Sequence, residues 1–131
     1  RSAGSMDEQK KVDVVCMGQA VLDCIVRGRE EDPAKPNVYR AQSIALSTGG
    51  DAVNESFNLA QMGFSARLVC GLGRDLAGNV ILGEAARRGV DTSCISVMDE
   101  LTTPIANLVV GKDGSRHSIN SSATLLTGYT P

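Results

Sequence analysis

One stretch of the sequence decides the fold: Ser47-Thr48-Gly49-Gly50-Asp51-Ala52-Val53-Asn54-Glu55-Ser56-Phe57-Asn58-Leu59-Ala60-Gln61-Met62-Gly63. Its two glycines form a turn that can approach a ligand closely and adopt positive φ, and Asp51 is placed to cap the following helix. Apolar residues recur at helical spacing in the second part, at Val53, Phe57 and Ala60. Gly63 stands where a left-handed helix terminus favours glycine. Asn54 lies one turn into the helix, and its carboxamide carries donors and an acceptor that suit the hydroxyl groups of a small polar molecule.

The segments on either side of this stretch predict an α/β core. A β-rich apolar run, Val12 to Met17, ends at Gly18 and has the form of a buried central strand. Ala66 to Cys70 predicts the next strand, and Asp75 is placed to cap a second helix that Gly89 ends. Strands and helices that alternate with short links predict parallel βαβ units wound right-handed.

The last third of the chain changes character. Three segments predict an antiparallel hairpin with an Asp-Gly turn: Ile105 to Val110, Lys112-Asp113-Gly114 and Arg116 to Ile119. The charged segment 27–37, with two prolines, predicts a loop, and Glu30-Glu31-Asp32 in it reads as solvated. The Ile105 to Val110 strand has apolar side chains on both faces and belongs to a hairpin too small to bury them alone. We therefore expect it to pair with residues 20–26 or 38–46, and with the same flap of a second chain in a homodimer.

Composition excludes several classes of protein. The 131 residues suffice for one modest domain, and a net charge of -2 with 3% aromatics gives neither the basic field nor the stacking surface of a nucleic-acid binder. No apolar run approaches the roughly 20 residues of a membrane span, and the N-terminus lacks a signal-peptide core, so we expect a cytoplasmic protein. The four cysteines show no metal-site spacing, and their apolar neighbours predict that each is a small buried hydrophobic residue. Residues 1–5, ahead of Met6, read as a vector remnant.

Two glycine-containing motifs together point to a known family. The Gly49-Gly50 turn with Asn54, followed by Gly71-Leu72-Gly73-Arg74-Asp75-Leu76-Ala77-Gly78, resembles the first signature of the ribokinase-like (PfkB-type) carbohydrate kinases. Gly18-Gln19-Ala20-Val21-Leu22-Asp23 resembles the family's first strand, with an Asp five positions after a Gly. The resemblance runs from about Val12 to the end of the chain. It implies an α/β, ribokinase-like fold, in which residues 6–131 form the N-terminal part of a kinase domain with lid strands near 19–27, 38–46 and 103–120.

The resemblance also implies a function for the intact protein. Family members transfer the γ-phosphoryl group of ATP, with Mg²⁺, to a hydroxymethyl oxygen of a sugar, and their catalytic Asp lies in a Gly-Ala-Gly-Asp motif that nothing here matches. The segment Leu126 to Pro131 falls where the family would enter its next core strand. We therefore expect this chain to be the sugar-binding N-terminal portion, without the nucleotide site and inactive alone.

The resemblance implies the following sugar-binding residues: Asp23, Gly49, Gly50, Asp51 and Asn54. A carboxylate at Asp23, just beyond a parallel strand, would face the crevice that open sheets use for ligands; a surface loop Asp is the alternative. Asp51 is a departure, since many relatives carry Lys or a small residue there, and a simple N-cap is its alternative. Asn107 is a further candidate in the flap, and an edge-strand Asn is its alternative. His117 reads as a solvated flap residue.

Other interpretations remain open. The Gly71 to Gly78 run does not match GxGxxG, and a tight strand-to-helix turn explains it without a dinucleotide. Two carboxylates, Asp23 and Asp51, with no Lys or Arg in the matched positions predict an unphosphorylated sugar or polyol as substrate. The alternative functions are a non-catalytic sugar-binding or assembly module, whose flap is a subunit interface, and a nucleoside kinase of the same family.

Overall fold

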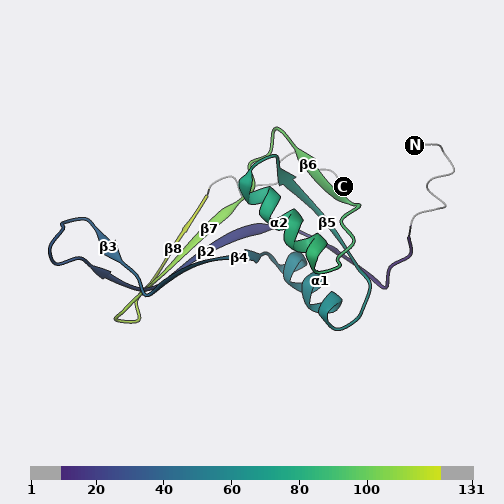
Figure 1. Cartoon of the computed structure of the whole chain (residues 1–131). Helices are drawn as coiled ribbons and strands as arrows, with labels where there is room; N and C mark the ends of the chain where they lie inside the picture. Colours follow the sequence, from purple (N-terminus) through teal and green to yellow (C-terminus); the bar gives the residue numbers. More distant parts are fainter. Residues whose placement is uncertain (1–9, 122–131) are drawn as a thin grey trace.

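A computed structural model describes residues 10–121, which form ten strands and helices (Figure 1). In chain order they are β1 Val14–Met17, β2 Val21–Glu31, β3 Tyr39–Arg40, β4 Ser43–Gly49, α1 Asp51–Gln61, β5 Ala66–Gly73, α2 Leu76–Arg87, β6 Ile95–Met98, β7 Ile105–Gly111 and β8 Arg116–Asn120. The predictions for residues 1–5 and 126–131 lie outside the described residues. The elements divide into an α/β body and a lid of strands that extends away from it.

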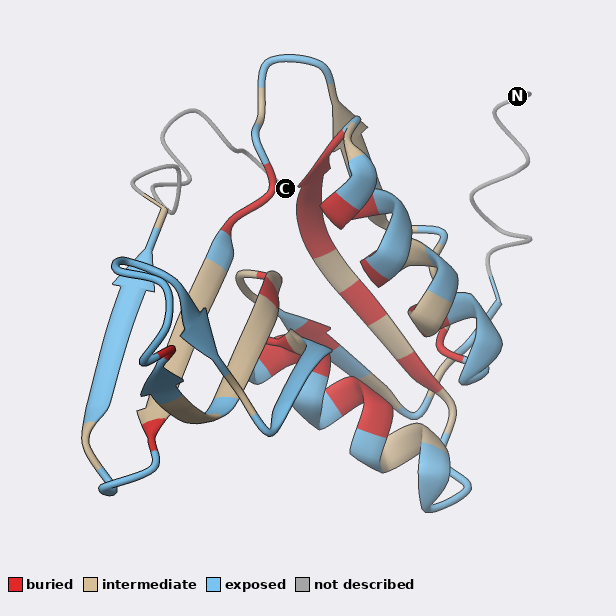
Figure 2. Cartoon of the chain, turned by 60° about the vertical axis from the view of Figure 1, so that its left-hand side comes forward, coloured by how far each residue is buried: buried red, intermediate tan, exposed pale blue. Residues whose placement is uncertain are grey.

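The body is a parallel sheet of three strands, in the order β1-β5-β6, covered by the two helices. The side chains of Leu68, Cys70 and Leu72 on β5 are all fully buried against the helices, with Val53 from α1 and Ile81 from α2. Figure 2 shows the buried residues gathered where the helices meet the sheet. The predicted α/β fold class and its parallel βαβ units are therefore confirmed.

Strand β1 differs from the expectation of a buried central strand. In the described chain it pairs with β5 alone and lies at the edge of the sheet. Cys16 faces the core with 4% of its surface exposed, whereas Val15 and Met17 on the other face are 54% and 63% exposed. Both helices contact β5, and they leave the face that carries Val15 and Met17 open.

The lid is a sheet built around β2. Strands β3 and β4 pair with it antiparallel, β7 pairs with it parallel, and β8 forms the predicted antiparallel hairpin with β7. The flap thus pairs with residues 22–29 of β2, the first of the two segments expected from the sequence, whereas β3 and β4 from the second segment pair with β2 instead. The lid is mixed rather than purely antiparallel. The reason is topological, because the chain passes through the body between β2 and β7 and both strands leave the body in the same direction.

The predicted loop at residues 27–37 is wrong in its first half, because β2 continues to Glu31. The strand passes through a bulge at Gly28, which has φ +73° and shifts the register against β7. Asp32 is 7% exposed rather than solvated. Its carboxylate accepts hydrogen bonds from Ala34 N and Arg40 Nε, both at 2.9 Å, and so closes the turn between β2 and β3.

The helix ends follow the sequence except at one cap. Asp75 caps α2 as predicted, and Gly63 and Gly89 follow the two helices with φ values of +93° and +77°. At the start of α1, however, the N-cap residue is Gly50 and no side chain caps the helix. Asp51 is the first helical residue, where its charge still favours the helix dipole.

Candidate functional site

Asp23 lies on β2, beside the diglycine turn that ends β4. A Cβ atom on Gly49 would lie 3.0 Å from Asp23 Cγ and closer still to Oδ2, so the carboxylate occupies the space that glycine leaves open. Burial raises the pKa of Asp23, and within residues 10–121 no group hydrogen-bonds or ion-pairs with this carboxylate. A half-buried carboxylate without a partner carries a desolvation cost, and such groups gather at functional sites.

The second glycine of the turn joins α1 to the segment that follows β1. Gly50 has φ +97°, and a Cβ there would lie 3.1 Å from the carbonyl carbon of Gln19 and closer to its oxygen. Asn54 N donates to Gly50 O at 2.9 Å, which is the first hydrogen bond of the helix. Because no side chain caps α1, the amide groups of its first turn are left for solvent or a ligand.

These elements border an open hollow of ≈ 420 Å³. Its lining residues are Met17, Gly18, Gln19, Gly50, Asp51, Ala52 and Glu55. Glu55 is a candidate that the sequence analysis missed, although its position one turn after Asp51 on the same helix was a usable signal. Burial is the main cause that raises the pKa of the Cys16 thiol, and the charge of Glu55 adds to it. The hollow is therefore acidic, and none of its described lining residues is Lys or Arg.

The structure brings only some of the predicted residues together. Asp23 is next to Gly49, and Gly50 and Asp51 share the hollow. Asn54 is exposed on the first turn of α1, and its side chain hydrogen-bonds no described residue. That Asn54 and Asp23 reach the same small ligand stays a prediction.

Asn107 is separated from this group by the strand register. Asp23 is aligned with Ala106, and Asn107 is aligned with Cys24, so the side chains of Asp23 and Asn107 point to opposite faces of the lid. The expectation that Asn107 contacts a ligand held by Asp23 is therefore corrected. Its Oδ1 atom is buried and has no hydrogen-bond partner in the described structure.

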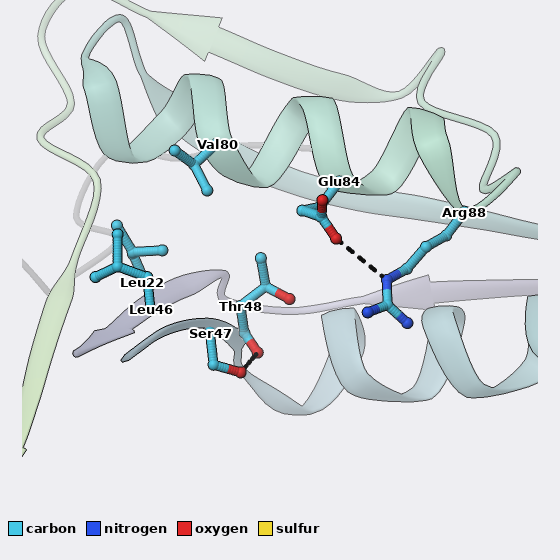
Figure 3. Close-up of a pocket in the computed structure, with 7 residues that line it drawn as sticks. All are labelled: Leu22, Leu46, Ser47, Thr48, Val80, Glu84 and Arg88. Atoms are coloured by element: carbon cyan, nitrogen blue, oxygen red, sulfur yellow. Dashed lines mark hydrogen bonds and ion pairs between the residues drawn. The ribbon is translucent and has the colours of Figure 1, made fainter. Parts of the chain in front are cut away.

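A second hollow, of ≈ 230 Å³, lies between the root of the lid and α2 (Figure 3). The lid lines it with two apolar and two polar residues, Leu22, Leu46, Ser47 and Thr48, and α2 lines it with Val80, Glu84 and Arg88. Hydrogen bonds from Arg87, opposed by some burial and aided by Arg88, lower the pKa of Glu84 to about 2. Its two charged residues pair with each other, and Leu22, Leu46 and Thr48 lie on the lid face opposite to Asp23, so the hollow presents both polar and apolar surface there.

Comparison with known proteins identifies the family. A family model described as pfkB family carbohydrate kinase matches residues 11–127. The chain belongs to this family. The resemblance that the two glycine-containing motifs indicated is thereby confirmed.

Solved structures of ribokinase-like enzymes share the fold of this PfkB-family chain. They include fructokinase from Xylella fastidiosa (23% identity, TM-score 0.70, 86% of this chain and 34% of that one). Ribokinase from Arabidopsis thaliana, solved with ribose and ATP, matches at 23% identity and TM-score 0.72 over 86% of this chain and 36% of that one. A nucleoside kinase from Methanocaldococcus jannaschii matches at 22% identity and TM-score 0.66, over 82% of this chain and 36% of that one. The chain thus spans about a third of the length of these structures.

Two further observations concern residues 10–121 alone. They contain no group of three or more His, Cys, Asp or Glu side chains that could hold a metal ion. No helix in this range is long and apolar enough to cross a membrane.

Proposed function

We propose that the intact protein transfers the γ-phosphoryl group of ATP to a hydroxyl group of a free sugar or related polyol, and that this chain carries the sugar-binding side. Family membership supports the reaction class. The observation that carries the binding site is Asp23, a half-buried carboxylate without a described partner, beside the diglycine turn. ATP supplies the phosphoryl group, and we expect the residues that hold it and its Mg²⁺ from the rest of the protein.

In this proposal Asp23 orients the sugar. Its two oxygens accept hydrogen bonds from two hydroxyl groups, and such charge-assisted bonds recover part of the cost of burying the carboxylate. Gly49 leaves room for the carboxylate, and Asn54 and the uncapped amide groups of α1 are placed to add polar contacts. Catalysis then consists mostly of positioning one hydroxyl group for in-line transfer.

The charge of the hollow favours an uncharged substrate. Asp51 and Glu55 line it, Asp23 lies next to Gly49 of the diglycine turn, and no described lining residue is cationic. A carboxylate and a substrate phosphate about 4 Å apart would repel each other by about 4 kcal/mol per pair of unit charges at an effective dielectric constant near 20. This repulsion exceeds the net stabilisation from a hydroxyl hydrogen bond. Solvent screening at the exposed Asp51 reduces this figure, but its sign still disfavours a sugar phosphate.

A coupled ADP-release assay on the full-length protein tests the proposal. The panel contains free sugars, polyols, sugar acids, nucleosides and sugar phosphates, with Asp23→Asn as the matched variant. We expect the highest kcat/KM for a free sugar or polyol and a large loss in Asp23→Asn. A preference for fructose 6-phosphate would show that the charge argument is wrong, a preference for a nucleoside would favour the nucleoside-kinase alternative, and binding without turnover would favour the non-catalytic module.

We also propose that the lid face opposite to Asp23 is a homodimer interface. This outer lid face carries an apolar set around one amide: Cys24, Val26, Ile44, Leu46, Ile105, Asn107, Val109 and Ile119. Ile44, Leu46 and Ile119 are each more than 60% exposed. Asn107 lies in one row between Cys24 and Ile119, and its unpartnered Oδ1 suits a second copy because a carboxamide can both donate and accept.

Sedimentation velocity of paired variants tests the interface. Ile119→Lys places a charge on the outer lid face, whereas Ser118→Lys places the same charge on the neighbouring residue of β8, which faces the other way. We expect dimers in the wild type and Ser118→Lys and monomers in Ile119→Lys. A wild type that stays monomeric at high concentration would remove the dimer.

A further inference from the structure

Asp75 binds two segments that are far apart in the sequence. Its Oδ1 accepts a hydrogen bond from Gly78 N at 2.8 Å and so caps α2. Its Oδ2 accepts a second one from Thr103 N at 2.9 Å, in the connection between β6 and β7. Both carboxylate oxygens are therefore used. Burial raises the pKa of Asp75, but the hydrogen bonds from Thr103 and Gly78 outweigh it and hold the pKa below its ordinary value.

The side chain of Thr103 in turn hydrogen-bonds the strand that precedes Asp75. It is 1% exposed, and its Oγ1 accepts a hydrogen bond from Gly73 N at 2.8 Å. The packing is too close for side chains at the neighbouring glycines. A Cβ on Gly73 would lie 2.9 Å from Thr103 N, and one on Gly78 would lie 3.0 Å from Thr103 Oγ1. The absence of side chains at Gly73 and Gly78, in the Gly71 to Gly78 motif, thus leaves room for the segment that carries Thr103.

This segment leads directly into the lid. Pro104 O accepts a hydrogen bond from Leu22 N at 2.9 Å, and the parallel pairing of β2 with β7 starts at the next residues. Asp23 follows Leu22 and is aligned with Ala106. The path from the Asp75 carboxylate to the backbone that carries Asp23 therefore consists of hydrogen bonds and buried residues only.

We propose that Asp75, together with Thr103, is a positioning residue for sugar binding, which fixes the root of the lid and through it the place of Asp23. The inference rests on the proposed function. Asp75 touches neither sugar nor nucleotide in this scheme, and it acts through the start of β7. Because a shift of the β2 backbone would weaken the hydrogen bonds from Asp23 to the sugar, we expect the loss of one of the Asp75 hydrogen bonds to raise the sugar KM about tenfold, which corresponds to about 1.4 kcal/mol.

The test uses Asp75→Asn in the full-length protein, with Asp91→Asn as the matched control. Asparagine offers one acceptor oxygen, so one of the two amide groups loses its partner. Asp91 also uses both oxygens, for Ser93 N and Arg67 Nε at 2.9 Å, but it lies at the other end of β5. Residues 67 and 73 on that strand are about 20 Å apart, from a rise of about 3.3 Å per residue. Both variants lose stability, and only Asp75→Asn should raise the sugar KM, with the ATP KM and kcat little changed.

Thr103 gives a second pair of variants. Thr103→Val keeps the shape and removes the acceptor for Gly73 N, whereas Thr103→Ser keeps the hydroxyl group. We expect Thr103→Val to reproduce the rise in sugar KM and Thr103→Ser to restore values near the wild type. An unchanged sugar KM in both Asp75→Asn and Thr103→Val, or equal rises in Asp75→Asn and Asp91→Asn, overturns the proposal.

Hydrogen exchange separates this inference from the proposed function. Amide groups of residues 22–26 in β2 and 105–109 in β7 should exchange faster in Asp75→Asn than in Asp91→Asn, whether or not the protein phosphorylates a sugar. If the wild type turns over none of the tested substrates, the proposed function fails while the exchange comparison still decides the lid anchor. Equal exchange in the two variants shows that Asp75 does not anchor the lid.

Discussion

Replacing Gly49 by alanine tests whether Asp23 and the diglycine turn form one unit. The added Cβ would lie 3.0 Å from Asp23 Cγ and closer to Oδ2, and Cβ atoms in folded proteins essentially never lie that close to other atoms. Gly49 is not among the glycines with positive φ, so the backbone itself tolerates alanine. The variant should therefore fold, and the carboxylate of Asp23 should move.

The size of the effect follows from the contacts at stake. A hydrogen bond to a charged group contributes about 1.5–3 kcal/mol, and about 1.4 kcal/mol corresponds to tenfold. Losing one such bond between Asp23 and the sugar should lower kcat/KM about 10- to 140-fold. In the Gly49→Ala background, Asp23→Asn should add little further loss, because two changes that disturb the same contact are not additive.

The assay is steady-state kinetics of the full-length protein with its best sugar, with thermal unfolding measured in parallel. Gly83→Ala is the matched control, since it lies in α2 with nothing within 4 Å of the added Cβ. It should raise stability by about 0.8–1.0 kcal/mol from helix propensity and leave the sugar KM unchanged. Wild-type kcat/KM in Gly49→Ala, or fully additive losses with Asp23→Asn, would refute the reasoning.

Three more predictions concern stability. Gly50→Ala should lower the free energy of unfolding in urea by several times the roughly 1 kcal/mol of a typical substitution, since φ is +97° and the added Cβ meets the Gln19 carbonyl group. Asp23→Asn should raise Tm at pH 7 while it impairs sugar binding, because burial raises the pKa of Asp23 and disfavours its ionised form in the folded protein. The increase in Tm should become smaller as the pH falls, because the wild-type carboxyl group then becomes protonated. Burial raises the pKa values of Asp75 and Asp91, but hydrogen bonds outweigh it and hold both pKa values below their ordinary value. The stability that these carboxylates contribute is therefore present above about pH 4 and lost below it. The free energy of unfolding should depend less on pH in this acid range in Asp91→Asn than in the wild type, and parallel curves would contradict this.

Features with local causes could be predicted from the sequence. The C-terminal glycines of both helices, the Asp75 cap and the Asp-Gly turn of the flap each depend on a few neighbouring residues, and the structure has them where expected. The cap of α1 is a local feature that the sequence analysis missed, because Gly50 takes the cap position with positive φ and shifts Asp51 into the helix. Strand β6 was not predicted, because the polar Ser96 interrupts its short apolar run.

The direction and register of distant pairings could not be predicted. The parallel direction of β7 beside β2 is set by the path through the body, and the length of β2 depends on the bulge at Gly28. The face on which Asn107 lies follows from its alignment with Cys24, and a shift of one residue would turn it toward the face of Asp23. Residue type alone therefore suggests a polar contact at Asn107 but cannot choose the face.

The glycines that suggested a ligand site turn out to have partners within the chain. The space beside Gly49 holds the Asp23 carboxylate, that beside Gly50 holds the Gln19 carbonyl group, and Gly73 and Gly78 admit the Thr103 segment. The contacts of Gly50, Gly73 and Gly78 join the body to segments that lead into the lid, and the contact of Gly49 joins two lid strands, β4 and β2. Loss of activity on substitution of a glycine would thus not show by itself that a ligand approaches it. Non-additive losses of kcat/KM in Gly49→Ala and Asp23→Asn are stronger evidence. They require that the substrate contacts the Asp23 carboxylate, which has no described partner within the chain.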